Sequence, residues 1–113
     1  MDCVFCRIAA HAIPATIRHE TADIVAFDDL HPRAPLHVLL IPKRHIPSVR
    51  ELDDGDAGLM GELVIAARTI AQAQGIAAGG YRLVVNCGND GGQEVAHLHL
   101  HLIGGKRLGA MAG

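Results

Sequence analysis

The spacing of hydrophobic and polar positions changes several times along this chain, and each spacing predicts an element. Segments 16–20, 23–29 and 81–85 are short runs rich in apolar and β-branched residues, which is typical of strands. Segment 37–42 is apolar almost throughout and predicts a buried strand that ends at Pro42.

Between residues 56 and 74, apolar residues recur three and four positions apart, which predicts one long amphipathic helix. Asp56 is its candidate N-terminal cap, and Gly75 is its stop signal. Ser48 and Glu51 have the spacing of a capping box, which predicts a short helical turn before this helix. The predicted buried stripe of the long helix comprises Leu59, Leu63, Ala66, Ala67, Ile70 and Ala71.

Residues 97–103, His-Leu-His-Leu-His-Leu-Ile, alternate strictly between imidazole and apolar side chains. A strand places successive side chains on opposite faces, so three imidazoles share one face and the leucines can bury on the other. The order of elements is then β, β, β, α, β, β. It predicts an α+β fold in a single domain of residues 1–113, with an antiparallel meander as its sheet.

Composition narrows the class of protein. Hydrophobic residues make up 50% of the 113 residues and charged residues 19%, which is typical of a globular chain and not of a disordered one. A formal net charge of -2 argues against non-specific binding to nucleic acid, and no apolar run reaches transmembrane length. The first residues lack the features of a signal peptide. We therefore expect a cytoplasmic protein with reduced cysteines and no nucleic-acid or membrane partner.

The three histidines of segment 97–103 have two interpretations. One is a surface strand that binds metals adventitiously, or imidazoles that are satisfied by their neighbours. The other is a functional site. Clustered imidazoles lose solvation and repel one another when protonated, and Thr or Val would serve a purely structural strand better. The pattern therefore favours a site.

Cys3 and Cys6 form a C-x2-C pair. A redox pair normally opens a helix after a strand, and only two residues precede Cys3, which disfavours that interpretation. A zinc site needs two more ligands, and His45 with one member of the histidine run could supply them. A thiol pair without metal remains the alternative. The other cysteine, Cys87, and four further histidines carry no motif and are expected to be surface or structural residues: His11, His19, His31 and His37.

Segment 86–92, Asn-Cys-Gly-Asn-Asp-Gly-Gly, is rich in turn-forming residues and leads through Gln93 toward the histidine run. Glycines let backbone N–H groups approach an anion closely, so this loop could hold a phosphate group for attack by an imidazole. The alternative is a plain connection between strands. Proximity to the histidines favours the phosphate loop.

These residues resemble the histidine triad (HIT) superfamily, and in particular its Hint branch. The histidine run carries the signature, and further segments of Hint type follow one another in order along nearly the whole chain. They are Ile-Pro-Ala at 13–15, Ala-Phe-Asp-Asp at 26–29, Ala-Pro-Leu-His at 34–37, Ile-Pro-Lys-Arg-His at 41–45, Tyr-Arg-Leu-Val-Val-Asn at 81–86, Gly-Gly-Gln at 91–93 and Gly-Gly at 104–105.

The resemblance implies a five-stranded antiparallel sheet with one long and one short helix, continued across a homodimer. It implies hydrolysis of P–N bonds in purine nucleoside phosphoramidates, AMP or GMP derivatives such as adenylylated amines, through a nucleotidyl-histidine intermediate. His99 would be the nucleophile, and His101 would bind the phosphate oxygens. The other implied contacts are Asn86, Gly92 and Gln93 for the phosphate, Asp29 for the ribose, and Phe5, Ile8, Phe27 and Leu30 for the base.

Zinc-bearing members of the superfamily imply a ligand set of Cys3, Cys6, His45 and His97. His97 would then be structural, and zinc would anchor the N-terminal segment. The chain departs from the Hint pattern at Glu94, where many members have Ser or Thr. It also departs at Asp28, where some members have His, and in the tail 109–113. Our hypothesis is that Glu94 faces away from the phosphate or favours a cationic amine leaving group.

Two alternatives to the phosphoramidase stay open at this point. The first is a dinucleoside polyphosphate hydrolase, which would use the same nucleophile. The second is a non-catalytic module that binds nucleotide or zinc. The intact middle histidine, His99, argues against the module, because a protein that only binds does not need a nucleophile there.

Overall fold

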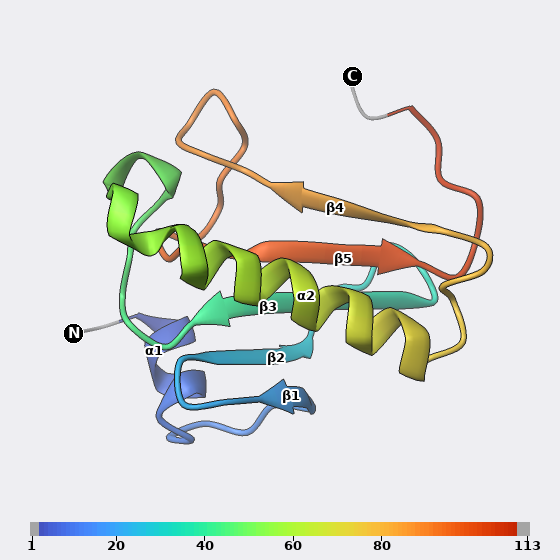
Figure 1. The fold of residues 1–113 in the computed structure, drawn as a ribbon, viewed down its shortest axis with the longest axis horizontal. Coiled ribbons are helices and arrows are strands. Elements are labelled where there is room, and N and C mark those ends of the chain that lie inside the picture. The colour runs from blue at the N-terminus through green and yellow to red at the C-terminus, as the bar shows by residue number, and fades with distance from the viewer. Residues whose placement is uncertain (1–2, 111–113) are drawn as a thin grey trace.

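The computed structural model describes residues 3–110. Residues 1–2 and 111–113 lie outside the described part, and they include the end of the tail noted above. Five strands pair antiparallel in the spatial order β1-β2-β3-β5-β4 (Figure 1). Their bounds are Ile17–Glu20 for β1, Ile24–Asp28 for β2, Leu36–Pro42 for β3, Tyr81–Val85 for β4 and Leu100–Gly104 for β5.

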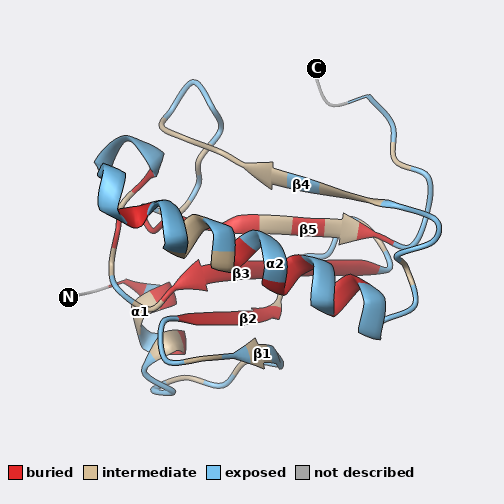
Figure 2. Ribbon diagram, viewed as in Figure 1, coloured by how far each residue is buried: buried red, intermediate tan, exposed pale blue. Residues whose placement is uncertain are grey.

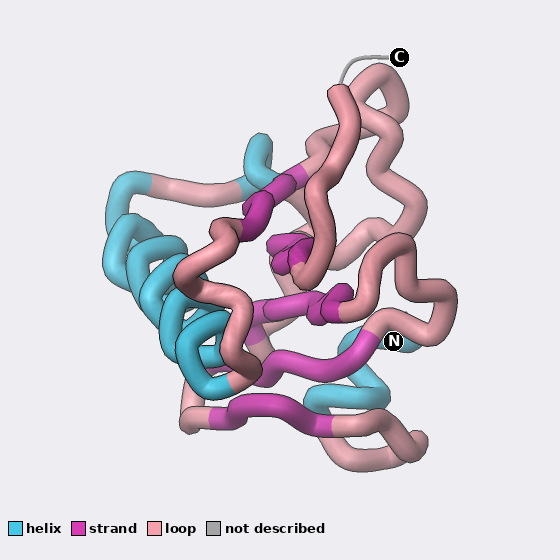
Figure 3. Tube along the Cα trace, turned by 90° about the vertical axis from the view of Figure 1, so that its right-hand side faces the viewer, coloured by secondary structure: helices cyan, strands magenta, loops and turns pink. Residues whose placement is uncertain are grey.

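Two α-helices lie on opposite faces of this sheet (Figure 3). The short helix α1 spans Val4–Ala9, and the long helix α2 spans Ala57–Ala73. Two single turns of 3-10 helix, Val49–Glu51 and Asp54–Asp56, precede α2. No helix in the described part of the chain is long and apolar enough to span a membrane.

The sheet confirms the predicted antiparallel α+β fold but not a simple meander. β5 lies between β3 and β4, so the last two strands are reversed relative to a meander. The long helix lies between β3 and β4 in the chain. Its 17 residues extend about 25 Å and carry the chain back along the sheet, and the loop after it leads to β4 at the outer edge before β5 fills the gap (Figure 1).

The face of the sheet beneath α2 holds the larger hydrophobic core (Figure 2). Alternate residues of three strands point into it, including Val38, Leu40 and Leu102, each with no exposed surface. The predicted stripe of α2 is confirmed: Leu63, Ala66, Ala67, Ile70 and Ala71 are buried in this core, and the half-buried Leu59 packs against it.

The opposite face carries a smaller apolar cluster beneath α1. Phe5 and Ile8 of the helix pack there against Phe27, Leu39 and Ile41 of the sheet. Sequence patterning did not predict this helix. The side chain of Cys3 caps it by accepting from the backbone N–H of Cys6 at 3.4 Å.

The histidine strand starts later than predicted. β5 begins at Leu100, so His97 and His99 lie in the segment that leads into it. The backbone N–H of His97 donates to the carbonyl of Val95, and that of Leu98 donates to the carbonyl of Ile46. These two bonds take the place of the hydrogen bonds that a strand would make with its neighbour. The backbone at His97 is therefore not part of β5.

The ends of α2 differ from the prediction in one respect. Gly75 follows the last turn with φ of 76°, and the N–H of Ile76 bonds to the carbonyl of Ala71, which completes the expected glycine stop. Asp56 makes no side-chain capping bond to α2. Its carboxylate instead accepts from the backbone N–H of Asp53 and from Arg44.

Candidate active site

The imidazole of His99 is fixed by its own segment of backbone. Its Nδ1 lies 2.7 Å from the carbonyl oxygen of His97. A carbonyl oxygen only accepts, so Nδ1 carries the proton and Nε2 keeps its lone pair. The ring of Phe5 meets the His99 ring edge to face, with the centroids 5.2 Å apart. The nitrogen that the resemblance implies as the nucleophile, Nε2, is therefore held in one orientation.

The tautomer of a second imidazole, that of His101, is set by two consecutive hydrogen bonds, which form a tautomer relay. The backbone N–H of Arg33 donates to Nδ1 of His37 at 3.1 Å, so the proton of the neutral His37 ring is on Nε2. This Nε2 lies 2.9 Å from Nδ1 of His101 and donates to it. The proton of His101 is thereby assigned to its own Nε2.

Both rings of this relay are neutral near pH 7. Burial lowers the pKa of His37, and the charge of Arg33 lowers it further, while Asp29 raises it. Burial, together with His99 and His37, lowers the pKa of His101 to about 4. His101 is therefore a neutral hydrogen-bond donor rather than a cation.

A cavity of about 310 Å³ opens beside these rings. It lies where the segments that follow β2 and β4 meet the start of β5. A cavity of this volume is at the lower end of the range for small-molecule sites. Its lining residues are Asp29, His31, Arg33, Asn86, Gly92, Glu94, His99 and His101.

The loop after β4 is folded tightly beside this cavity. Asn86 donates through Nδ2 to the carbonyl of Gly91 at 2.7 Å. A Cβ at Gly91 would lie 2.4 Å from the carbonyl oxygen of Cys87, and Gly92 has φ of 76°, so both positions require glycine. The loop is a tight glycine turn beside the cavity, and its contact with an anion stays a prediction.

Gln93 holds this loop in place. Its Oε1 accepts from the N–H of Gly88, and its Nε2 donates to the carbonyls of Pro47 and Val95. The amide is thus committed to three backbone groups. It shapes the glycine loop and is not among the residues that line the cavity.

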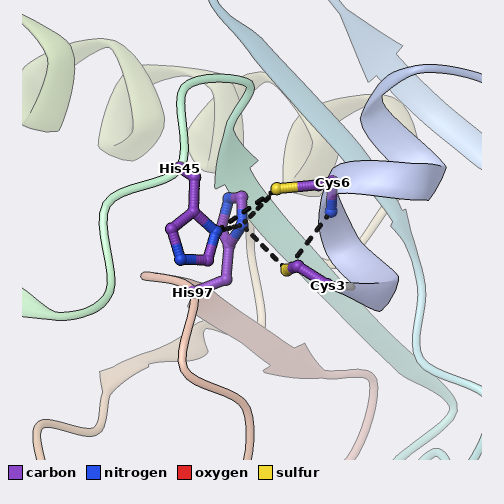
Figure 4. Close-up of side chains that lie close together, drawn as sticks. All are labelled: Cys3, Cys6, His45 and His97. Atoms are coloured by element: carbon purple, nitrogen blue, oxygen red, sulfur yellow. Dashed lines mark hydrogen bonds between the residues drawn. The ribbon is translucent and has the colours of Figure 1, made fainter. Parts of the chain in front are cut away.

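Four candidate metal ligands converge at the N-terminus of α1 (Figure 4). His97 donates through Nε2 to the carbonyl of Pro42 at 2.8 Å, which leaves its Nδ1 lone pair facing the thiols. That Nδ1 lies 3.4 Å from Sγ of Cys3, 3.6 Å from Sγ of Cys6 and 3.2 Å from Nδ1 of His45. His45 Nδ1 in turn lies 3.3 Å from the Cys6 sulfur.

This geometry fits zinc. A tetrahedron with ordinary Zn–N and Zn–S bonds has edges of about 3.3–3.8 Å between its ligand atoms. The observed separations of 3.2–3.6 Å match such edges. Burial lowers the pKa of His97 and favours the neutral ring that a metal needs. The bond from His97 to Pro42 is the outer contact that orients a ligating imidazole.

The residues expected to contact the base separate into two groups. Phe5, Ile8 and Phe27 are buried together, with the two phenyl centroids 5.5 Å apart, and Phe5 touches the His99 ring. Leu30 is 88% exposed and does not belong to that cluster. Of the remaining predicted contacts, Asp29 lines the cavity, and its Oδ1 accepts from the N–H of His31.

Sequence reasoning missed three residues of this site. His37 was expected to be surface or structural, but its ring is buried and sets the tautomer of His101. His31, expected likewise, lines the cavity, as does Arg33. A histidine inside an otherwise apolar strand was the available signal.

The two departures from the Hint pattern that lie in the described part of the chain have different surroundings. Asp28 makes two hydrogen bonds to the guanidinium of Arg18, at 2.7 and 2.8 Å, and so ties β2 to β1. Glu94 is among the residues that line the cavity, which favours the second form of the hypothesis, a preference for a cationic amine, over the first. Its Oε1 lies 4.0 Å from a guanidinium nitrogen of Arg33.

Known proteins resemble this chain over nearly its whole length. A family model described as scavenger mRNA decapping enzyme C-term binding matches residues 2–111. Protein HitA of Neisseria gonorrhoeae is 43% identical over 103 residues, which cover 91% of this chain and 95% of that protein. The purine nucleoside phosphoramidase of Escherichia coli K12 is 40% identical over 110 residues, which cover 97% and 92%.

Solved structures agree. A HIT family hydrolase from Legionella pneumophila Philadelphia 1 has a TM-score of 0.92 and 48% identity, and the match covers 94% of this chain and 95% of that one. A histidine triad protein from Clostridium difficile has a TM-score of 0.96 and 41% identity, covering 99% and 97%. The chain therefore belongs to the histidine triad family. The relatives named above include a HIT family hydrolase and a phosphoramidase, which support hydrolase activity for this chain.

Proposed function

We propose that this protein hydrolyses the P–N bond of purine nucleoside phosphoramidates, such as adenylylated amines, through a nucleotidyl-histidine intermediate. The observation that carries the proposal is the imidazole of His99, held by the His97 carbonyl with the Nε2 lone pair free for attack. The choice of substrate is supported by the relative from Escherichia coli, whose name is purine nucleoside phosphoramidase.

The reaction would run in two displacements at phosphorus. Nε2 of His99 attacks, an N–P bond forms, and the P–N bond to the amine breaks. The departing nitrogen takes a proton from solvent and leaves as the free amine. Water then attacks the same phosphorus, the bond to His99 breaks, and the excess proton returns to solvent. The products are a nucleoside monophosphate and an amine.

The other cavity residues would position the phosphate. The Nε2–H of His101 is the donor for a phosphate oxygen, because Nδ1 already accepts from His37. The turn at Gly92, beside Asn86, would let backbone approach the same oxygens. The carboxylate of Asp29 has acceptor capacity left for ribose hydroxyls.

A purine would lie on the apolar side of His99. Phe5 is the cluster residue in contact with the His99 ring, and Ile8 and Phe27 support it from behind. Leu30 is exposed and would cover the base from the solvent side. Two aromatic rings suit a planar ligand, because offset and edge contacts add to area burial.

Dinucleoside polyphosphate hydrolysis is a second candidate, and one observation favours it. A neighbouring cavity of about 330 Å³ shares Arg33, Asn86 and His101 with the first. Arg82 also lines it. Two guanidinium groups there could neutralise phosphates beyond the one under attack.

A direct assay tests the proposal. The protein is incubated with a fluorogenic adenosine phosphoramidate and, separately, with a dinucleoside polyphosphate, beside the variants His99→Ala and His19→Ala. We expect amine release by the parent and by His19→Ala, whose histidine lies on β1, but not by His99→Ala. Cleavage of the polyphosphate alone would favour the second candidate. Tight AMP binding with no turnover of either compound would indicate a non-catalytic module instead.

We propose zinc as a structural cofactor held by the four converging ligands. When bound, it would supply cross-linking and no chemistry, because the Nδ1 lone pair of His97 would be committed to the metal. Cys3 caps α1 and Cys6 lies in its first turn, and that helix carries Phe5 against His99. The metal would therefore hold the floor of the site in place. Reduced thiols of this kind also fit the expected cytoplasmic location.

We propose a homodimer in which the outer edge of β4 pairs with its counterpart. β4 ends the sheet order in the described part of the chain. Leu83 on β4 is an exposed apolar side chain, and α2 exposes two more, Val64 and Ile65. Sedimentation of Leu83→Glu should show a monomer, whereas Ile17→Glu, at the opposite edge of the sheet, should remain dimeric. A dimer in both variants would contradict this interface.

A further inference from the structure

Glu94 has a fixed backbone and a free side chain at the rim of the catalytic cavity. Gln93 just before it is bound to three backbone groups, so the chain cannot move away from the site without breaking those bonds. The Glu94 side chain itself is 82% exposed and still lines the cavity with His99 and His101.

Few charged side chains line this cavity, so each of them has a large share in the electrostatic potential inside it. The two histidines of the tautomer relay are neutral, because burial lowers the pKa of both. The carboxylates of Asp29 and Glu94 and the guanidinium of Arg33 also line the cavity, beside the imidazoles of His31 and His99. A nucleotide would add the negative charge of its phosphate. The complex would then carry more negative than positive charge.

Arg33 offsets Glu94 only in part. The two charged groups are 4.0 Å apart, and the Arg33 side chain is 77% exposed. Water screens such a pair, and exposed ion pairs of this kind contribute little to stability. Arg33 therefore does not hold the Glu94 carboxylate in a fixed ion pair, and the carboxylate stays available to pair with a cationic group of a ligand that enters the cavity.

The Glu94 carboxylate would act on the leaving group of the substrate and not on the nucleotide. The nucleotide would be held by contacts with His101, the glycine loop and Asp29. The leaving group has no such partners among the proposed contacts, and Glu94 is the carboxylate at the rim. A positive charge on the leaving group would be attracted there, and a negative one would be repelled.

On the basis of the proposed function, we infer that Glu94 is a specificity-determining residue that selects phosphoramidates whose leaving amine carries a second, cationic group. The ligand class is a nucleoside phosphoramidate of a diamine, with one nitrogen bonded to phosphorus and the other protonated. The competing interpretation is a solvated surface carboxylate with no effect on turnover.

The test uses three adenosine phosphoramidates of similar length, made with 1,4-diaminobutane, butylamine and 4-aminobutanoate. They present a cationic, a neutral and an anionic leaving group behind a similar scissile nitrogen. We expect the parent to prefer them in that order by kcat/KM. Glu94→Gln should reduce the ratio of cationic to neutral substrate about fivefold, the scale of an exposed ion pair. The reduction should shrink in high salt.

Two further variants sharpen the test. Arg33→Gln should increase the same ratio, because Glu94 then loses its neutralising partner, even if Arg33 also contributes to phosphate binding. Asp54→Asn removes one negative charge from the turn before α2, away from the cavity lining, and should leave the ratio unchanged. It therefore controls for net charge.

The outcomes separate this inference from the proposed function. If all three compounds are hydrolysed and Glu94→Gln leaves their ratios unchanged, the role of Glu94 is wrong and the phosphoramidase activity stands. A parent that prefers the anionic substrate would also overturn it. If the parent hydrolyses none of the three, the proposed function fails and the inference fails with it.

Discussion

The Nε2 of His37 donates to Nδ1 of His101 at 2.9 Å, across the neighbouring strands β3 and β5. His37 does not line the cavity, so it is a positioning residue that acts through His101. The direction of donation follows from the Arg33 N–H, which occupies the other nitrogen of His37. The backbone amide of Arg33 therefore determines which ring nitrogen of His101 carries the proton and can donate to a ligand.

His37→Phe should lower kcat about 100-fold, the usual cost of losing one oriented donor at the reacting group. The substitution removes the donor that fixes His101 in its Nε2–H tautomer. His37→Gln should recover much of the rate, because its amide N–H can donate to the same nitrogen. The ¹⁵N shifts of the His101 ring report the tautomer directly. His19→Phe is the matched control. Equal rates for the Phe and Gln variants would indicate packing alone.

Cys6→Ser should lose bound zinc and lower the free energy of unfolding by about 3 kcal/mol or more, because metal binding and folding are coupled at such sites. Metal content after gel filtration and urea unfolding measure the two effects. Cys87→Ser is the control, since Cys87 is half-buried in the glycine loop and outside the ligand set. Stoichiometric zinc in Cys6→Ser would contradict the proposed ligands.

Acid should destabilise the protein before His101 itself becomes charged. Burial lowers the pKa of His101 to about 4, whereas an unfolded histidine titrates near its ordinary value of 6.5. Between these values the unfolded chain binds more protons, so the free energy of unfolding falls as pH falls. One such group contributes at most about 1.4 kcal/mol per pH unit.

Urea unfolding at pH 6.5 and pH 5 measures this effect. Comparison of the parent with His101→Gln isolates the contribution of the one ring, because the other histidines titrate in both proteins. We expect a smaller loss of stability in the variant. An NMR titration in which the His101 ring protonates near pH 6.5 would contradict the structure.

Gly91→Ala should disturb the glycine loop after β4. Its Cβ would lie 2.4 Å from the carbonyl oxygen of Cys87, so backbone must shift at a cost of about 1–3 kcal/mol. We expect at least a tenfold loss of kcat/KM together with a lower melting temperature. Gly79→Ala, in the loop before β4, meets nothing closer than 4.0 Å and should change neither quantity. Full activity in Gly91→Ala would show that the loop does not position substrate.

Long periodic segments were predictable from the sequence, and their outcomes show why. The stripe on α2 repeats over many turns, and β4 was predicted with its observed bounds because apolar residues and glycines frame it. Helix α1 was missed for the opposite reason. It has six residues, too few for a periodic signal, and its capping group is the sulfur of Cys3, a residue type outside the usual caps.

Site residues were predictable from the sequence where they belong to a recognisable local motif. They were not predictable where the pairing of distant strands brings them together. His99 and the ligand set of Cys3, Cys6, His45 and His97 were all named from motifs and resemblance. His37 was not, because its role arises when β3 pairs with β5 and brings two rings together from positions 64 residues apart. The late start of β5 has the same origin, since Leu98 bonds to the distant Ile46.

Leucine and histidine alternate along β5, and this pattern makes the strand intolerant of insertions and deletions. Leu100 and Leu102 point into the core beneath α2, and His101 between them faces the cavity. One inserted residue would exchange the two faces, placing an imidazole in the core and a leucine at the cavity. Substitutions can be repaired one at a time, but such a frame slip would damage folding and catalysis together. Length variation should therefore concentrate in the connecting loops, with β5 keeping a constant length.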